Sequence, residues 1–203
     1  MNSSEEVKRY VETCHETFWQ NIFQFETRYL IAGLKNCRDV LSVGCGPAII
    51  EGTLGEHGFN VTGLDISAEA LECAPDSVRT FEGRAEDMPF EESSFDAVIY
   101  VASLQFIEDY RKALQQTLTV LKPKGRIIVM LLNPESDFFK ERLLEPDSYV
   151  HLIRHTDLNK IENVIRGFYT AKTEYILGVK GENIFKSKKP TEAALYAIVG
   201  RKK

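Results

Sequence analysis

Short apolar runs alternate along the chain with segments in which apolar residues recur every three to four positions. The runs at 97–101 and 127–132 are unbroken, which is typical of strands buried on both faces of a sheet. Strands are predicted at 40–43, 59–64, 78–81, 97–101 and 126–132. Helices are predicted at 48–54, 68–74 and 107–121. Strands that alternate with helices predict an α/β fold with a mostly parallel sheet covered on both faces.

The two ends of the chain extend this pattern. Residues 1–36 are expected to be helical, with aromatic side chains that could close over a ligand as a lid. Beyond the fifth strand, helices are expected at 138–144 and 158–165, and strands at 173–179 and 194–199. The last two strands have no helix between them, so they are expected to form a hairpin that adds one antiparallel strand. The prediction is a Rossmann-like, doubly wound sheet of seven strands in one domain, 1–203, with a lid (1–36), a ligand-binding core (37–132) and a substrate side (133–203).

Composition narrows the class of protein. The 203 residues are 43% hydrophobic, enough for one sizeable core, and the net charge of -5 gives no reason to expect a nucleic-acid partner. No apolar run is long enough to cross a membrane, and the N-terminal segment is too polar for a signal peptide. The four cysteines lack C-x-x-C spacing, so we expect reduced thiols, no metal site and a cytoplasmic location.

A glycine turn carries the candidate chemistry. Gly44-Cys45-Gly46 lies between a predicted strand and a predicted helix, where glycines permit a tight turn and close approach of a ligand to the backbone. Asp65 ends the next strand, at the same edge of the sheet, where a carboxylate can accept hydrogen bonds from both hydroxyls of a ribose. A G-x-G-x-x-G dinucleotide fingerprint would need glycine at Ile49, which leaves a nicotinamide oxidoreductase as a distant alternative.

Five segments, in this order, resemble the motifs of class I S-adenosylmethionine-dependent methyltransferases, in particular the ubiquinone and menaquinone methyltransferase group (methyltransferase type 11). They are residues 40–46, 63–67, 83–90, 94–98 and 121–126. The resemblance implies S-adenosylmethionine as cofactor and S-adenosylhomocysteine as product. It also implies methyl transfer to a small-molecule acceptor by in-line displacement, with the acceptor unidentified.

The same resemblance implies roles for individual residues. The turn would lie under the methionine and ribose, Asp65 would hold the ribose, and the end of the fourth strand would face the methionine amino group. The implied cofactor-binding residues are Gly44, Cys45, Gly46, Asp65, Ile66, Ala85, Glu86 and Val101. Three positions depart from the family pattern: Ser42 stands where an acid is usual, Ala48 follows Pro47 in the glycine turn, and Arg84 stands where many relatives carry an aspartate.

No fixed catalytic motif is expected, because methyl transfer depends mainly on alignment and exclusion of water. The candidates are Gln105, Tyr10 and His151, the last of which would pair with His155 if that stretch were helical. Two alternatives stay open at this point. The fold could bind the cofactor as a regulatory module without transfer, or it could methylate proteins through a groove in 133–167.

Overall fold

The computed structural model describes the backbone of residues 4–203 and the side chains from Arg9 onward. Residues 1–3 of the predicted N-terminal helical segment lie outside this range. The strands are β1 (Asp39–Val43), β2 (Asn60–Asp65), β3 (Arg79–Glu82), β4 (Phe95–Val101), β5 (Leu121–Leu132), β6 (Tyr169–Lys180), β7 (Asn183–Phe185) and β8 (Ala193–Lys202). The α-helices are α1 (Ser4–Cys14), α2 (Thr17–Gly33), α3 (Ile49–Glu56), α4 (Ala68–Leu71), α5 (Tyr110–Val120), α6 (Asp137–Leu143) and α7 (Leu158–Phe168). Two 3₁₀ turns, η1 (Leu104–Phe106) and η2 (Tyr149–Leu152), complete the described elements.

All the strands join one sheet in the order β3-β2-β1-β4-β5-β8-β6-β7. The first five pair in parallel, and β8 enters between β5 and β6, antiparallel to both. The predicted mostly parallel sheet with an antiparallel C-terminal strand is therefore confirmed. The strand order changes direction between β1 and β4, so the carboxyl ends of β1, β2 and β4 meet at the switch point where open α/β sheets bind ligands.

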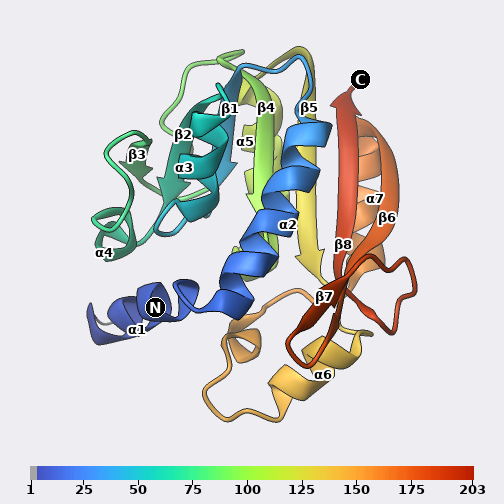
Figure 1. The fold of residues 1–203 in the computed structure, drawn as a ribbon. Helices are drawn as coiled ribbons and strands as arrows, with labels where there is room; N and C mark the ends of the chain where they lie inside the picture. The colour runs from blue at the N-terminus through green and yellow to red at the C-terminus, as the bar shows by residue number, and fades with distance from the viewer. Residues whose placement is uncertain (1–3) are drawn as a thin grey trace.

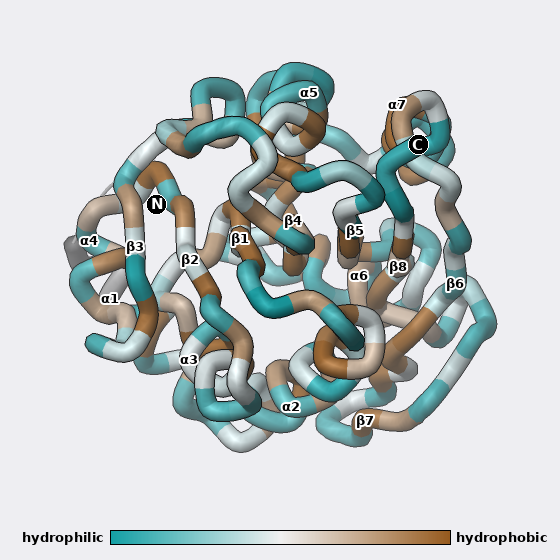
Figure 2. Tube along the Cα trace, turned by 90° about the horizontal axis from the view of Figure 1, so that it is seen from above, coloured by the Kyte–Doolittle hydropathy of each residue, from teal (hydrophilic) through white to brown (hydrophobic). Residues whose placement is uncertain are grey.

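The sheet lies between two layers of helices (Figure 2). One layer contains α2, α3 and α6, and the other contains α5 and α7. The apolar run of β5 is buried by both layers, and Ile127 to Leu131 are fully enclosed. Each layer thus has its own hydrophobic cluster, with alternate residues of the same central strands contributing to one or the other.

Two features differ from the sequence-based expectation. The sheet has eight strands in the described residues rather than seven, because the three-residue β7 pairs with the end of β6. A three-residue strand among polar neighbours carries no period that a sequence could reveal. The N-terminal segment is not one lid but two helices separated at His15 and Glu16. Leu30 and Leu34 are fully buried, so α2 is a core helix, whereas α1 lies beside α4 near the carboxyl ends of β1 and β2 (Figure 1).

Among the described residues, no helix has the length and apolar character needed to cross a membrane.

Candidate cofactor site

The glycine turn follows β1 and is shaped by contacts that exclude side chains. Gly44 has φ +73°, and a Cβ there would lie 2.5 Å from the Cβ of Ser103. Ser103 follows β4 and donates from Oγ to the carbonyl of Val43 at 2.5 Å. The amide of Gly44 donates to the carbonyl of Leu64 at 2.7 Å. The turn is therefore held by both strands that flank β1, and glycine is required because backbone and neighbour leave no room for a side chain.

Asp65 and Gly46 are brought together as the sequence predicted. The carboxylate of Asp65 accepts from the amide of Gly46 at 2.7 Å and from the amide of Ser67 at 2.9 Å. Each carboxylate oxygen keeps a further lone pair, so the group can still accept hydrogen bonds from a ligand. The ring of Tyr10 lies over the same turn, with Cε1 at 3.8 Å from the position of a Cβ on Gly46. Helix α1 thus places an aromatic ring beside the predicted cofactor residues.

Cys45 has a different surrounding from the two glycines. Its Sγ fills the space above Gly63, where a Cβ would lie 2.6 Å away. Burial, followed by the charges of Glu51 and Asp65, raises the pKa of this thiol well above its ordinary value. A neutral, packed thiol is a poor nucleophile, so Cys45 contributes its backbone to the turn rather than reactive sulfur.

The departure at Ala48 has a visible backbone consequence. Ala48 has φ +53° and precedes the first turn of α3. This is the left-handed region that favours glycine, and an alanine there costs about 1 kcal/mol. The residue is completely buried, so the strained conformation is held by its surroundings.

The departure at Ser42 is accompanied by a carboxylate from another element. Ser42 Oγ donates to Oε1 of Glu51 at 2.5 Å, and both side chains are buried, with 1% and 3% exposed. Glu26 of α2 is also buried, with 4% exposed. Burial and the charge of Glu51 raise the pKa of Glu26 to about 8, and burial raises the pKa of Glu51 to about 7. Sequence reasoning missed both acids, although each directly follows an apolar residue on the part of its helix that is expected to face the core, which is a usable signal.

The predicted adenine side lies in the loop after β3. Ala85 is buried, and Glu86 accepts from Arg84 at 2.9 Å and from the amide of Asp109 at 3.3 Å. Arg84 also reaches Glu108 at 3.2 Å, so it ties this loop to the start of α5. Ile66 is 63% exposed directly after Asp65, and an exposed apolar side chain there can cover one face of a planar ring.

The catalytic candidates fall in three different places. Tyr10 lies at the turn, as described above. Gln105 is fully buried and exchanges two hydrogen bonds with Leu132, donating at 3.1 Å and accepting at 2.6 Å. It also donates to the carbonyl of His155 at 3.1 Å, so its amide is used to join η1, β5 and the segment before α7.

The two histidines do not form a pair. The 3₁₀ turn η2 ends at Leu152, so the helical spacing that would align them is absent. A ring nitrogen of His151 contacts the carbonyl of Glu145 at 3.0 Å, whereas His155 contacts the carbonyl of Ile107 at 2.9 Å. The part of the chain that the structure describes contains no cluster of acids, histidines and cysteines suited to a metal ion.

Aromatic side chains gather where α2 meets the segment after β5. Trp19 of α2 packs edge-on against Phe138 of α6 and Tyr149 of η2, with ring centroids 6.5 and 6.1 Å apart. The guanidinium of Arg142 lies 5.4 Å from the Trp19 ring centroid. The predicted aromatic segment therefore meets the segment after β5, which the sequence assigned to the acceptor.

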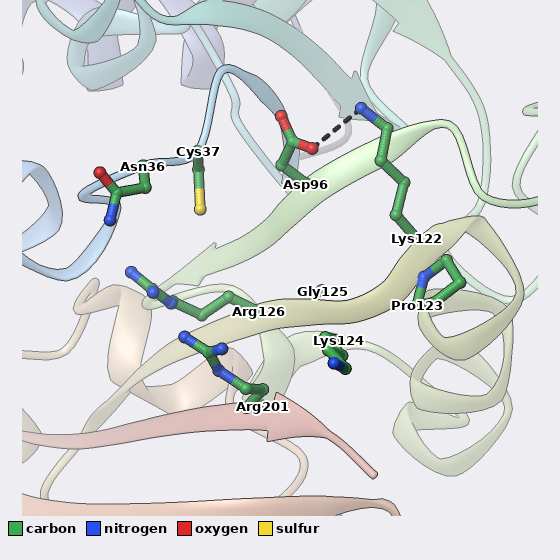
Figure 3. Close-up of a pocket in the computed structure, with 9 residues that line it drawn as sticks. All are labelled: Asn36, Cys37, Asp96, Lys122, Pro123, Lys124, Gly125, Arg126 and Arg201. Carbon is green, nitrogen blue, oxygen red and sulfur yellow. Dashed lines mark hydrogen bonds and ion pairs between the residues drawn. The ribbon is translucent and has the colours of Figure 1, made fainter.

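A separate hollow of about 320 Å³ lies at the opposite, amino-terminal edge of the parallel strands (Figure 3). It is lined by Asn36, Cys37, Asp96, Lys122, Pro123, Lys124, Gly125, Arg126 and Arg201. Nζ of Lys122 forms ion pairs with Oδ2 of Asp39 and Oδ1 of Asp96, each at 2.9 Å, and so connects the starts of β1 and β4. None of the predicted cofactor residues lines this hollow, so it is distinct from the switch-point site.

A family model and curated relatives match the central part of the chain. Residues 41–129 match the family model described as a methyltransferase domain. The demethylmenaquinone methyltransferase of Tropheryma whipplei (strain Twist) is 33% identical over 102 residues, which are 48% of this chain and 43% of that protein. The bifunctional biotin biosynthesis protein BioHC of Cellvibrio japonicus is 29% identical over 143 residues, 68% of this chain and 28% of that protein. The chain thus spans less than half the length of these curated relatives.

Solved structures extend the likeness to the whole chain. A Thermotoga maritima protein, described as an S-adenosylmethionine-dependent methyltransferase and possible histamine N-methyltransferase, has a TM-score of 0.79 at 23% identity, with 98% of each chain covered. A methyltransferase from Archaeoglobus fulgidus has a TM-score of 0.76 at 16% identity, covering 95% of this chain and 98% of that one. The chain therefore shares the fold of these S-adenosylmethionine-dependent methyltransferases, and its residues 41–129 match a methyltransferase domain.

Proposed function

We propose that this protein transfers the methyl group of S-adenosylmethionine to a small-molecule acceptor. The observation that carries the proposal is the hydrogen bond from the Gly46 amide to the Asp65 carboxylate. It links the glycine turn after β1 to the acid that ends β2. One curated relative named above is a demethylmenaquinone methyltransferase and the other is a biotin biosynthesis protein, which supports a small acceptor over a protein. The acceptor itself is left open.

The residues present fit this cofactor. Asp65 offers free lone pairs to the ribose hydroxyls, and the glycine turn lets the ligand approach the backbone without a side chain in the way. Ile66 offers an exposed apolar face to the adenine. When bound, S-adenosylmethionine supplies an electrophilic methyl carbon on a sulfonium sulfur. The ring of Tyr10 over the turn would exclude water from that edge, and an aromatic face favours a cation.

The remaining roles are proposals of the same standing. Ala85 would hold the adenine through its backbone amide, Glu86 would lie near the exocyclic amine, and Val101 would face the methionine. Residues 37–132 would form the cofactor core, and residues 133–203 would shape the acceptor site. The aromatic contacts of Trp19 support an acceptor pocket there. The four free cysteines support a cytoplasmic location, because thiols remain reduced in that compartment.

Calorimetry with S-adenosylhomocysteine tests the proposal. We expect the wild type to bind and Asp65→Ala to lose at least tenfold in affinity, because a charge-assisted hydrogen bond contributes roughly 1.5–3 kcal/mol. The exposed Asp76→Ala, in the loop after α4, is the matched control and should bind like the wild type. Unchanged affinity in Asp65→Ala would refute the ribose assignment.

Turnover with methyl-labelled S-adenosylmethionine then identifies the acceptor class. We expect label to enter the small-molecule fraction of a cell extract. Label confined to the protein fraction would instead support a protein methyltransferase. Binding without any transfer in either fraction would support a regulatory module.

A further inference from the structure

A buried carboxylate of α3 meets the side chain of Ser42 on β1 in this protein. Ser42 occupies the position on β1 where the resembled family usually has an acid. The carboxylate is supplied by Glu51, nine residues later in the first turn of α3, and Ser42 Oγ donates to it at 2.5 Å. The two positions face each other directly behind the glycine turn. A carboxylate therefore lies within hydrogen-bond distance of Ser42, although its backbone belongs to α3 rather than β1.

A second acid approaches the same point from α2. Glu26 is 4% exposed, and among the described side chains no hydrogen bond reaches its carboxylate. The charge of Glu51 acts on Glu26, and the charge of Glu26 acts on Tyr10 of α1 and on Tyr149 of η2, which places Glu26 among these three elements. Neither acid forms an ion pair with a described lysine, arginine or histidine. Two buried carboxylates without a cation are unfavourable in their ionised form, so a ligand that brings positive charge would be bound favourably here.

The chemistry of the pair selects the kind of cation. A primary ammonium has three N–H donors and is small enough to reach two carboxylates at once. No metal-binding cluster includes these residues in the described chain. The ligand of the proposed function carries one ammonium, on the amino-acid part that would lie next to the glycine turn. We propose that Glu51, oriented by Ser42 and joined by Glu26, binds the ammonium of the methionine part and replaces the missing acid of β1. This inference rests on the proposed function.

A pair of ligands separates ammonium recognition from general binding. S-adenosylhomocysteine carries the amino-acid part, whereas 5′-methylthioadenosine keeps the nucleoside and the thioether but lacks it. We expect Glu51→Gln to bind S-adenosylhomocysteine at least tenfold more weakly and 5′-methylthioadenosine within about twofold of the wild type. Retained binding of 5′-methylthioadenosine also shows that the variant is folded. Glu56→Gln, an exposed acid on the same helix, is the control and should change neither affinity.

A double variant that places the carboxylate on β1 instead of α3 provides a second test. Ser42→Asp combined with Glu51→Ala returns the carboxylate to β1, and we expect it to recover most of the affinity that Glu51→Ala alone loses. Equal losses for both ligands in Glu51→Gln would overturn the inference, because Glu51 would then only support the fold. Unchanged affinity for S-adenosylhomocysteine would also overturn it and would leave the proposed function intact. A wild type that binds neither ligand would refute the proposed function itself.

Proton release on ligand binding can be measured with the wild type alone. Ser42 of β1 is hydrogen-bonded to Glu51, the charge of Asp65 of β2 acts on Glu51, and the charge of Glu51 acts on Glu26 of α2, Tyr10 of α1 and Cys45 of the turn. The charge of Glu26 acts on Tyr149 of η2, and Cys14 is hydrogen-bonded to Tyr10. Burial raises the pKa of both tyrosines and both thiols, so they are neutral near pH 7. An ammonium that enters should therefore expel protons from the two acids. Calorimetry near pH 7 in two buffers of different ionisation enthalpy should show release with S-adenosylhomocysteine and none with 5′-methylthioadenosine. Equal release with both ligands would overturn the inference.

Discussion

The buried carboxyl group of Glu26 predicts that this protein, without ligand, loses stability as the pH rises. Its pKa in the folded chain is about 8, against an ordinary 4.5. At low pH the group is protonated in both states and costs nothing. Above pH 4.5 the glutamate of the unfolded chain releases its proton, whereas the folded chain keeps the proton until about pH 8. The free energy of unfolding therefore falls by about 1.4 kcal/mol per pH unit within this window.

Replacement of Glu26 by glutamine removes that dependence, because the amide has nearly the same shape and never ionises. We expect Glu26→Gln to match the wild type near pH 4.5 and to exceed it by about 3 kcal/mol at pH 7. The gain should level off above about pH 8, at an upper bound of roughly 5 kcal/mol. Solvent relaxation around the buried charge makes the realised gain smaller than this bound.

Urea denaturation of the ligand-free protein at about pH 5, 6, 7 and 8 provides the measurement. The exposed Glu56→Gln is the matched control, and its difference from the wild type should be small at every pH. A difference between Glu26→Gln and the wild type that stays constant with pH would refute the reasoning. A variant less stable than the wild type at pH 8 would refute it as well, because Glu26 would then be stabilised in its charged form.

Three further substitutions test the site and the core. Gly44→Ala should abolish binding of S-adenosylhomocysteine in calorimetry and lower the free energy of unfolding by about 1–3 kcal/mol, because φ is +73° and the new Cβ would meet Ser103. Normal binding would show that the turn does not contact the ligand. Gln105→Ala should lower the free energy of unfolding by about 1–3 kcal/mol, because it leaves the backbone of Leu132 unpaired, and ligand affinity should not change. Lost turnover with unchanged stability would instead make Gln105 catalytic. Leu114→Ala should lower the free energy of unfolding by about 2–5 kcal/mol, because it leaves a cavity in the core, and ligand affinity should not change. A smaller loss would mean that neighbouring side chains move in to fill the cavity.

The sequence by itself determined the parts of the fold that depend on local pattern. The unbroken run that ends at Leu132 predicted a strand buried on both faces, and the structure buries it there. The turn at Gly44 and Gly46 was recognisable because glycine is the residue that tolerates its backbone. Asp65 was recognisable because its place at the end of a strand follows from chain order alone. These features require only a few neighbouring residues, so a single sequence carries them.

Only the tertiary structure decided which distant side chains meet. Ser42 and Glu51 are hydrogen-bonded because α3 folds back over β1, and Glu26 joins them because α2 packs on the same face of the sheet. Gln105 reads as a polar residue near the site, yet its amide is bound to β5 and to the segment before α7. No periodicity links such positions, since their separation along the chain is set by the elements between them. The buried acids therefore become visible as a pair only when the packing of the helices against the sheet is known.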